Sequence, residues 1–196
     1  TLRASIKTSF LKGSLLDSKS EAYFCINTLL ILLSAAFWIR VINSVFSALK
    51  LTREKLAKEK DLIGFSGSPW TLACYMLEGG GSKDFALARK AAMRDSEFFA
   101  ELIKILTDSI VIYLSEQVKS GANVIKLFDS WAGILPPNEF KKWVIEPNKK
   151  IVSELKKQFP DLPIICFPRG AGFMFEEFTR EVKMDGLALD QNIDRV

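Results

Sequence analysis

A long helix that leads directly into a buried strand decides the fold class of this chain. The stretch is SEFFAELIKILTDSIVIYLSEQVKSGANVIKLFDSWAG, residues 96–133. Its first part, Ser96–Lys119, repeats apolar residues at three-to-four spacing, which predicts an amphipathic helix that Gly121 ends. Its second part, Asn123–Phe128, is a short and nearly continuous apolar run, which is typical of a strand buried on both faces. Together they predict one helix–strand step of an α/β fold.

The same alternation continues toward the N-terminus. LIGFSG, residues 62–67, predicts another strand, and Pro69 predicts the start of a helix because proline is tolerated at the first helical position. The sequence GGGSKDF then interrupts the helix, and Ser82 is a candidate cap for the helix that follows.

Toward the C-terminus the pattern repeats again. A helix is expected from the Pro136–Pro137 turn to Phe159, followed by a strand at Pro163–Phe167. A short helix at residues 175–182 and a strand at Gly186–Asp190 complete the series. Alternating helices and apolar strands predict a parallel sheet buried on both faces. Periodicity does not separate an open doubly wound sheet from a (β/α)8 barrel, but no dinucleotide or Walker-A phosphate motif occurs, and we favour the barrel.

Residues 1–60 differ from the rest, and we treat them as an atypical N-terminal region that precedes a barrel part at residues 61–196. The run Tyr23–Ile39 is uncharged and lies at the lower length limit for a membrane-spanning helix. It could be such a span, a helix buried in a larger core, or a stretch outside the true reading frame, which is the interpretation we favour. Asn43–Lys60 has the pattern of an amphipathic helix on a barrel exterior.

Composition excludes several classes of function. The chain has 196 residues, a formal net charge of +4 and no run of like charges, so nucleic-acid binding is not expected. It contains no histidine, which excludes Ser-His-Asp catalysis and most metal centres. Its three cysteines, Cys25, Cys74 and Cys166, are far apart and predict small buried hydrophobic residues in a reducing compartment. No metal site is expected.

Three ordered motifs carry a resemblance to a known family. They are GFSGSPWTLACYMLEGGGSKDF (64–85), GANVIKLFDSWAG (121–133), and PIICFPRGAG (163–172), the last followed by GLALD. In order and spacing they resemble the middle part of the uroporphyrinogen decarboxylase family, of the bacterial type, over about Asp61 to Asp190. The ordered set is specific, although a lone DSWAG would mean little.

The resemblance implies a partial (β/α)8 barrel and a carboxy-lyase of haem biosynthesis. It implies a cytoplasmic enzyme, commonly a homodimer, that uses no metal or organic cofactor. Its substrate would be uroporphyrinogen III, an anionic tetrapyrrole whose four acetate arms become methyl groups.

The resemblance also assigns site residues. Tyr75 matches the family's active-site tyrosine, and Ser130 matches its substrate-binding serine or threonine; without the family motif, a half-buried aromatic and a turn residue would be the simpler interpretations. Phe128, Asp129 and Trp131 are expected to form pocket wall and loop support. Lys126 could face the barrel interior or its rim, while Arg169 and Asp190 are weaker candidates.

Other parts of the family pattern are not found in the chain. These are its N-terminal arginine motif, its catalytic aspartate segment and a late histidine motif. We therefore expect a fragment that is inactive by itself. Two alternatives stay open: a corrinoid-linked methyltransferase of the same superfamily, which the absence of a His/Cys zinc set disfavours, and a non-enzymatic remnant anchored in a membrane by residues 23–39.

Overall fold

The structure is a computed structural model that describes residues 35–191. By its contacts the chain divides after Trp38, and the second unit, Ile39–Val196, contains the sheet. Most of the apolar run Tyr23–Ile39 lies outside the described residues. In the part that is described, no helix is both long and apolar enough to cross a membrane.

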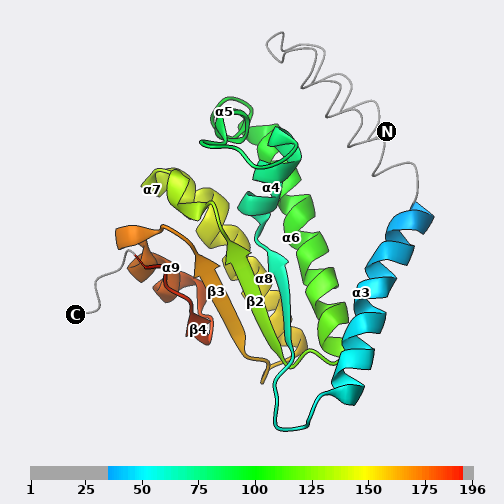
Figure 1. Cartoon of the computed structure of the whole chain (residues 1–196). Coiled ribbons are helices and arrows are strands. Elements are labelled where there is room, and N and C mark those ends of the chain that lie inside the picture. Colours follow the sequence, from blue (N-terminus) through cyan, green and yellow to red (C-terminus); the bar gives the residue numbers. More distant parts are fainter. Residues whose placement is uncertain (1–34, 192–196) are drawn as a thin grey trace. The chain divides into compact units, whose positions relative to one another are not determined.

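A parallel sheet forms the centre of this unit (Figure 1). Its strands follow one another in sequence order: β1 (Ile63–Gly67), β2 (Val124–Asp129), β3 (Ile164–Pro168) and β4 (Gly186–Leu187). Each neighbouring pair is parallel. All the predicted strands are present, so the prediction of an α/β fold with the strand–helix alternation of a partial (β/α)8 barrel is confirmed.

The last strand is shorter than predicted, because it ends at Leu187 and not at Asp190. The N–H of Ala188 still donates to the carbonyl of Cys166, at 2.9 Å. Beyond it, the Asp190 carboxylate accepts a hydrogen bond from the N–H of Gly170, at 2.7 Å. The chain therefore leaves the ladder to pack against the loop after β3.

The helices alternate with the strands. They are α3 (Ala35–Lys55), α4 (Pro69–Glu78), α5 (Ala86–Arg94), α6 (Ser96–Lys119), α7 (Pro137–Phe140), α8 (Glu146–Gln158) and α9 (Phe175–Val182). Short 3-10 turns occur at Ala132–Ile134 and Gly172–Met174, and a π-helical turn at Lys141–Ile145 joins α7 to α8. The observed α4, α6 and α9 begin where the sequence predicted.

The amphipathic helix predicted at Asn43–Lys60 is displaced, since α3 starts at Ala35 and ends at Lys55. Its early end has a local cause. The Arg53 guanidinium donates to the carbonyls of Leu56, Ala57 and Lys60, at distances between 2.9 and 3.1 Å. These bonds satisfy carbonyl groups that a continuing helix would have used, and they stabilise the turn into β1.

The prediction that Ser82 caps α5 is wrong. Phe85 occupies the N-cap position with a left-handed φ of 50°. The Ser82 hydroxyl accepts a hydrogen bond from the N–H of Phe85, which precedes the first residue of the helix. The free N–H groups of the first turn, those of Leu87 and Ala88, donate instead to the carboxylate of Glu78 at the end of α4. A distant side chain therefore caps the helix.

The two faces of the sheet have different surroundings. Ile125 and Leu127 on β2 are fully buried beneath the helices, in the main hydrophobic core. Cys74 and Cys166 are buried in the same core as free thiols, as predicted, while Cys25 lies outside the described residues. On the opposite face Phe65 is 61% exposed. Among the described strands, β1 and β4 each pair on one side only, so this sheet has two open edges.

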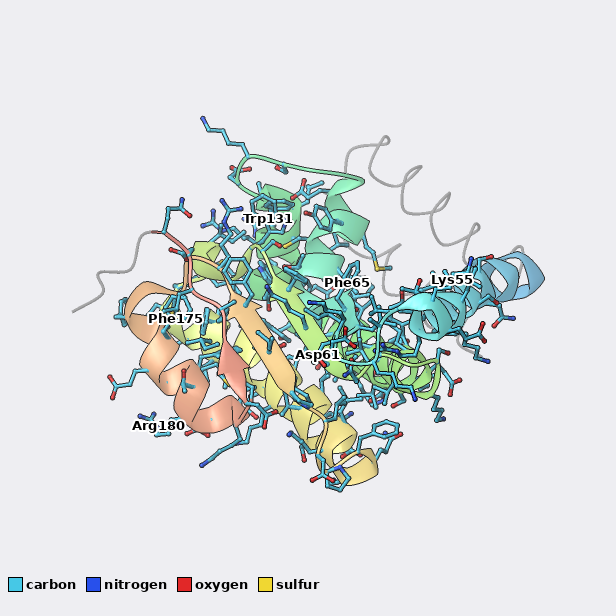
Figure 2. The ribbon with its side chains drawn as sticks, turned by 60° about the horizontal axis from the view of Figure 1, so that its bottom comes forward. Lys55, Asp61, Phe65, Trp131, Phe175 and Arg180 are labelled. Carbon is cyan, nitrogen blue, oxygen red and sulfur yellow. The ribbon has the colours of Figure 1, made fainter. Side chains whose placement is uncertain are left out.

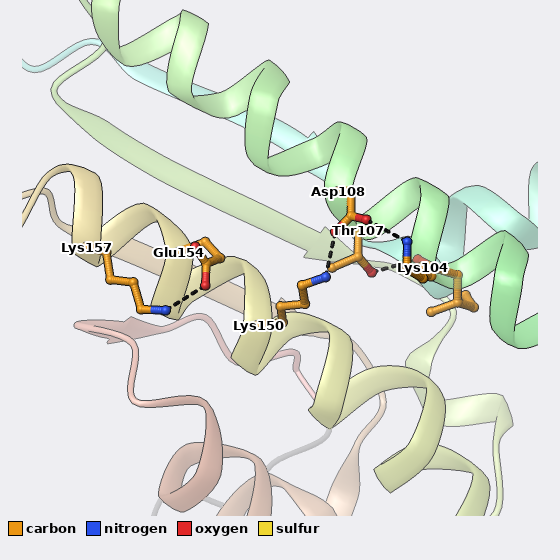
Figure 3. A network of polar contacts seen from close by, with 7 residues as sticks. Lys104, Thr107, Asp108, Lys150, Glu154 and Lys157 are labelled. Carbon is orange, nitrogen blue, oxygen red and sulfur yellow. Dashed lines mark hydrogen bonds and ion pairs between the residues drawn. The ribbon is translucent and has the colours of Figure 1, made fainter.

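An ion-pair network joins α6 to α8 on the exterior (Figure 3). The Asp108 carboxylate accepts from Lys150 on α8 and from Lys104 one turn earlier on α6. The hydrogen bond from Lys150 has the largest effect on Asp108 and lowers its pKa, and the hydrogen bond from Lys104 lowers this pKa further. The contribution of the ionised Asp108 carboxylate to stability is therefore present at neutral pH and is lost as the pH falls through this lowered pKa.

We expect Asp108→Asn to lower the midpoint of thermal unfolding by less than about 4 °C, because exposed ion pairs contribute little. The difference should shrink in 1 M salt, which screens exposed charges. Calorimetry at low and high salt measures both effects. Glu101→Gln on the same helix is the control, since no ion pair is found for Glu101 within the described residues. A large, salt-independent loss would contradict this account.

Candidate active site

The candidate residues lie at the carboxyl end of the sheet. In a barrel, the loops at this end carry the active site. Tyr75 lies in α4, which follows β1, and its side chain is 40% exposed. Ser130 is the first residue after β2 and is half-buried. Figure 2 shows Trp131 in the same loop, with Asp61, which precedes β1, toward the opposite end of the strands.

Trp131 connects the neighbourhoods of Tyr75 and Ser130. Its ring packs against Phe85, with centroids 4.5 Å apart, and forms a T-shaped pair with the Tyr75 ring, with centroids 6.3 Å apart. Tyr75 also contacts Phe85. Tyr75 and the residue next to Ser130 therefore share one aromatic cluster, although no direct bond joins the two predicted site residues. The contact that relates the two positions is therefore the one between the Tyr75 ring and the ring of the residue after Ser130.

The backbone of Trp131 is held on both sides. Its N–H donates to the Thr71 hydroxyl at 3.3 Å, and its carbonyl accepts from the indole N–H of Trp70 at 2.9 Å. The N–H of Ser68 donates to the carbonyl of Phe128 at 2.8 Å. The start of α4 is thus joined to the end of β2 and to the loop that follows it by these hydrogen bonds, in addition to the ladder that pairs β1 with β2.

Asp129 is the centre of a buried polar cluster that the sequence indicated only as loop support. It is 1% exposed and accepts from the Thr71 hydroxyl at 2.7 Å and from the Asn148 amide at 3.3 Å. The Ser68 hydroxyl donates to the other side of Asn148, at 2.9 Å. Burial raises the pKa of Asp129 to about 7, against the lowering effect of its hydrogen bonds from Thr71 and Asn148. Burial likewise raises the pKa of Cys74 and of Cys166, and the charge of Asp129 adds to both shifts.

The open face of the sheet carries an aromatic row that sequence analysis identified only in part. Phe65, Phe128 and Phe167 lie on neighbouring strands, and each adjacent pair of rings meets edge to face, with centroids 6.0 and 6.2 Å apart. Lys126 lies on the same face, with its ammonium 4.8 Å from the Phe128 ring and 5.8 Å from the Phe167 ring. Lys126 therefore lies on the sheet face away from the buried Ile125 and Leu127, the face that a closed barrel would enclose. Period-two alternation with the buried Ile125 and Leu127 could have revealed this.

The two weaker candidates lie at the rim. Arg169 has an exposed side chain, and its backbone N–H donates to the carbonyl of Asp129 at 3.0 Å. Asp190 holds the loop after β3 through its bond to Gly170. Neither side chain is brought to Tyr75 by any contact found in residues 35–191. Within the same residues, no three His, Cys, Asp or Glu side chains form a possible metal-binding group.

Comparison with known proteins gives consistent results. A sequence model of the uroporphyrinogen decarboxylase family (URO-D) matches residues 35–195. The uroporphyrinogen decarboxylase of Rickettsia bellii is 50% identical over 149 residues, which cover 76% of this chain and 44% of that protein. The Rickettsia akari enzyme is 45% identical over 152 residues, covering 78% of this chain and 45% of that protein. The chain therefore spans less than half the length of the curated relatives it matches.

A solved structure shares the fold. A methyltransferase from Methanosarcina mazei superposes with a TM-score of 0.66 at 20% identity, over 76% of this chain and 42% of that one. At this identity the likeness is one of fold and carries no conclusion about methyl transfer. The family match and the curated relatives agree on one assignment: this chain belongs to the uroporphyrinogen decarboxylase family.

Proposed function

We propose that this chain forms the part of a uroporphyrinogen decarboxylase that carries Tyr75 and Ser130. The observation that carries the proposal is the 50% identity over 149 residues to the Rickettsia bellii uroporphyrinogen decarboxylase. The reaction converts the four acetate arms of uroporphyrinogen III to methyl groups, giving coproporphyrinogen III. The protein would act in the cytoplasm, as a homodimer, without a metal or organic cofactor.

The chemistry explains what the residues must do. Protonation of a pyrrole carbon makes the ring an electron sink, which takes the electron pair of the breaking carbon–carbon bond as carbon dioxide leaves. The protein must hold the carboxylate arms and direct protons. The hydroxyl groups of Tyr75 and Ser130 can donate hydrogen bonds to a carboxylate without carrying charge.

The open sheet face supports the same proposal. A row of phenylalanine rings offers an apolar surface to a pyrrole macrocycle, and Lys126 adds a positive charge that suits an anionic substrate. The remaining strands of a barrel would pair with the open edges of β1 and β4 and enclose this face. We therefore propose that decarboxylation requires those strands and that the 196-residue chain is inactive by itself.

A chimera tests the proposal. Residues 61–190 of this chain would replace the matching stretch of the Rickettsia bellii enzyme, and coproporphyrinogen formation would be measured. We expect the chimera to be active and the isolated chain to be inactive. In the chimera, Tyr75→Phe and Ser130→Ala should each lower kcat/KM on the order of 100-fold, the usual effect of losing a positioned hydrogen-bond donor.

Matched variants separate chemistry from folding. Tyr113→Phe removes a phenol hydroxyl from α6, and Ser153→Ala removes a hydroxyl from the exposed side of α8. Neither residue belongs to the cluster around Tyr75 and Trp131, so both variants should leave kcat/KM within about twofold. A folded but inactive chimera, or unchanged rates for Tyr75→Phe and Ser130→Ala, would refute the proposal.

A further inference from the structure

We propose that Asp129 is a positioning residue: its buried carboxylate fastens the first turn of α4 to the loop after β2 and so sets where Tyr75 and Ser130 lie. The inference rests on the proposed function for the roles of those two residues. The positioning itself is a property of the folded chain and can be measured without substrate.

The carboxylate joins three elements. One oxygen accepts from Thr71 on α4, at 2.7 Å, and the other accepts from Asn148 on α8, at 3.3 Å. Asn148 is itself fixed, because its amide also donates to the Val144 carbonyl at 2.9 Å and its oxygen accepts from Ser68 at 2.9 Å. The side chains that form these hydrogen bonds are all buried, so water cannot replace the bonds; they belong to Ser68, Thr71, Asp129 and Asn148.

The contacts reach Ser130 from both sides. Asp129, which precedes it, is held by its side chain and by its carbonyl, which accepts from the Arg169 N–H at 3.0 Å. Trp131, which follows it, donates its N–H to the Thr71 hydroxyl that itself donates to Asp129. Ser130 lies between two residues fixed by the same threonine, so its backbone position depends on that cluster.

The contacts reach Tyr75 through α4. Thr71 and Tyr75 are four residues apart in one helix, so they lie on the same side of it. The carboxylate also lies at the first turn of α4, where the helix dipole favours a negative charge. Anchoring Thr71 therefore sets both the end and the rotation of the helix that presents the tyrosine.

An acidic residue is unexpected in a purely structural role at this buried position. Burial disfavours its charged form, and no lysine or arginine among the described residues contributes to its titration. The titratable groups that face it are the thiols of Cys74 on α4 and Cys166 on β3, whose raised pKa values keep them neutral. Asn148 from α8 is neutral. Asp129 is thus the group of this cluster that changes charge near neutral pH, with a pKa of about 7.

Nuclear magnetic resonance of the whole chain tests the inference. The ¹³Cγ shift of Asp129 and the amide shifts of Ser130 and Trp131 would be followed from pH 5 to 9, a range centred on about 7. We expect the two amides to titrate with the same midpoint as the carboxyl. In Asp129→Asn, which removes the titrating group, we expect displaced amide shifts that no longer depend on pH in this range. In Thr71→Val, which removes a hydrogen bond that lowers the pKa of Asp129, we expect displaced amide shifts and a midpoint at higher pH. Thr71→Ser, which retains the hydroxyl, should restore the wild-type pattern.

Asp161→Asn, in the exposed loop before β3, is the matched control and should leave the Ser130 titration unchanged.

A second measurement follows the free energy of unfolding as a function of pH. Because the folded pKa of Asp129 is raised, its stabilising effect is present below about pH 4 and is lost as the pH rises through about 7, so wild type should lose stability relative to Asp129→Asn across this window.

The wild-type titration alone can overturn the inference, even where a variant fails to fold. Amide shifts of Ser130 that stay flat while the Asp129 carboxyl titrates would show that the carboxylate does not position the loop. The same conclusion would follow if a folded Asp129→Asn kept wild-type shifts and titration. An inactive chimera would leave this result untouched, so the failure of one proposal is distinct from the failure of the other.

Discussion

Trp70→Ala should lower the free energy of unfolding by about 3–5 kcal/mol, the usual cost of truncating a buried tryptophan. Trp70 is 0% exposed and packs against Phe99, with ring centroids 5.7 Å apart. Its indole N–H donates to the Trp131 carbonyl at 2.9 Å, so the substitution also leaves a carbonyl without its partner. Because typical domains have only about 5–15 kcal/mol of stability, this change removes a large part of the total.

Trp70→Phe separates packing from hydrogen bonding. Phenylalanine keeps an aromatic ring in the core but cannot donate to Trp131, so we expect a loss of about 1–3 kcal/mol. Equilibrium unfolding in urea measures both variants, with the midpoint and slope fitted together. Equal losses for the two variants would mean that the hydrogen bond, and not the ring volume, dominates. A loss below about 1 kcal/mol for Trp70→Ala would contradict the packing described for this core.

Gly133→Ala should be the second most damaging change, because a β-carbon at this position has no room. It would lie 2.3 Å from the carbonyl oxygen of Gly170 and 2.6 Å from its carbon. These are backbone atoms, so no side-chain rotation can relieve the contact. The N–H of Gly133 also donates to the Arg169 carbonyl at 3.0 Å, which keeps the two loops together. We expect a loss of about 2–3 kcal/mol, typical of overpacking, or a displaced loop after β2.

Gly80→Ala is the control for Gly133→Ala. A β-carbon on Gly80 would meet no atom within 4 Å. Its stability should therefore stay within about 0.5 kcal/mol of wild type. Urea unfolding of both variants measures the difference. If Gly133→Ala is as stable as Gly80→Ala and leaves the Ser130 amide shift unchanged, the loops after β2 and β3 are not locked together as described.

The sequence by itself determined the order and type of the elements. Period and length placed α6 at Ser96–Lys119 and α9 at residues 175–182, because a helix that buries one side must repeat its apolar residues every three or four positions. Short apolar runs marked the strands for the same reason of burial. The motifs around Tyr75 and Ser130 were sufficient to indicate the family. The roles of these two residues stay predictions.

Tertiary structure decided how those elements meet. No local pattern indicated that Thr71 and Asn148 would both bond Asp129, since the partners are 58 and 19 residues away along the chain. Nor did any such pattern reveal that Glu78 would cap α5 in place of Ser82, or that Gly133 and Gly170 would touch backbone to backbone. Local patterns report which residues are buried. Which buried polar groups become partners depends on distances between elements, and those are set only when the helices pack on the sheet.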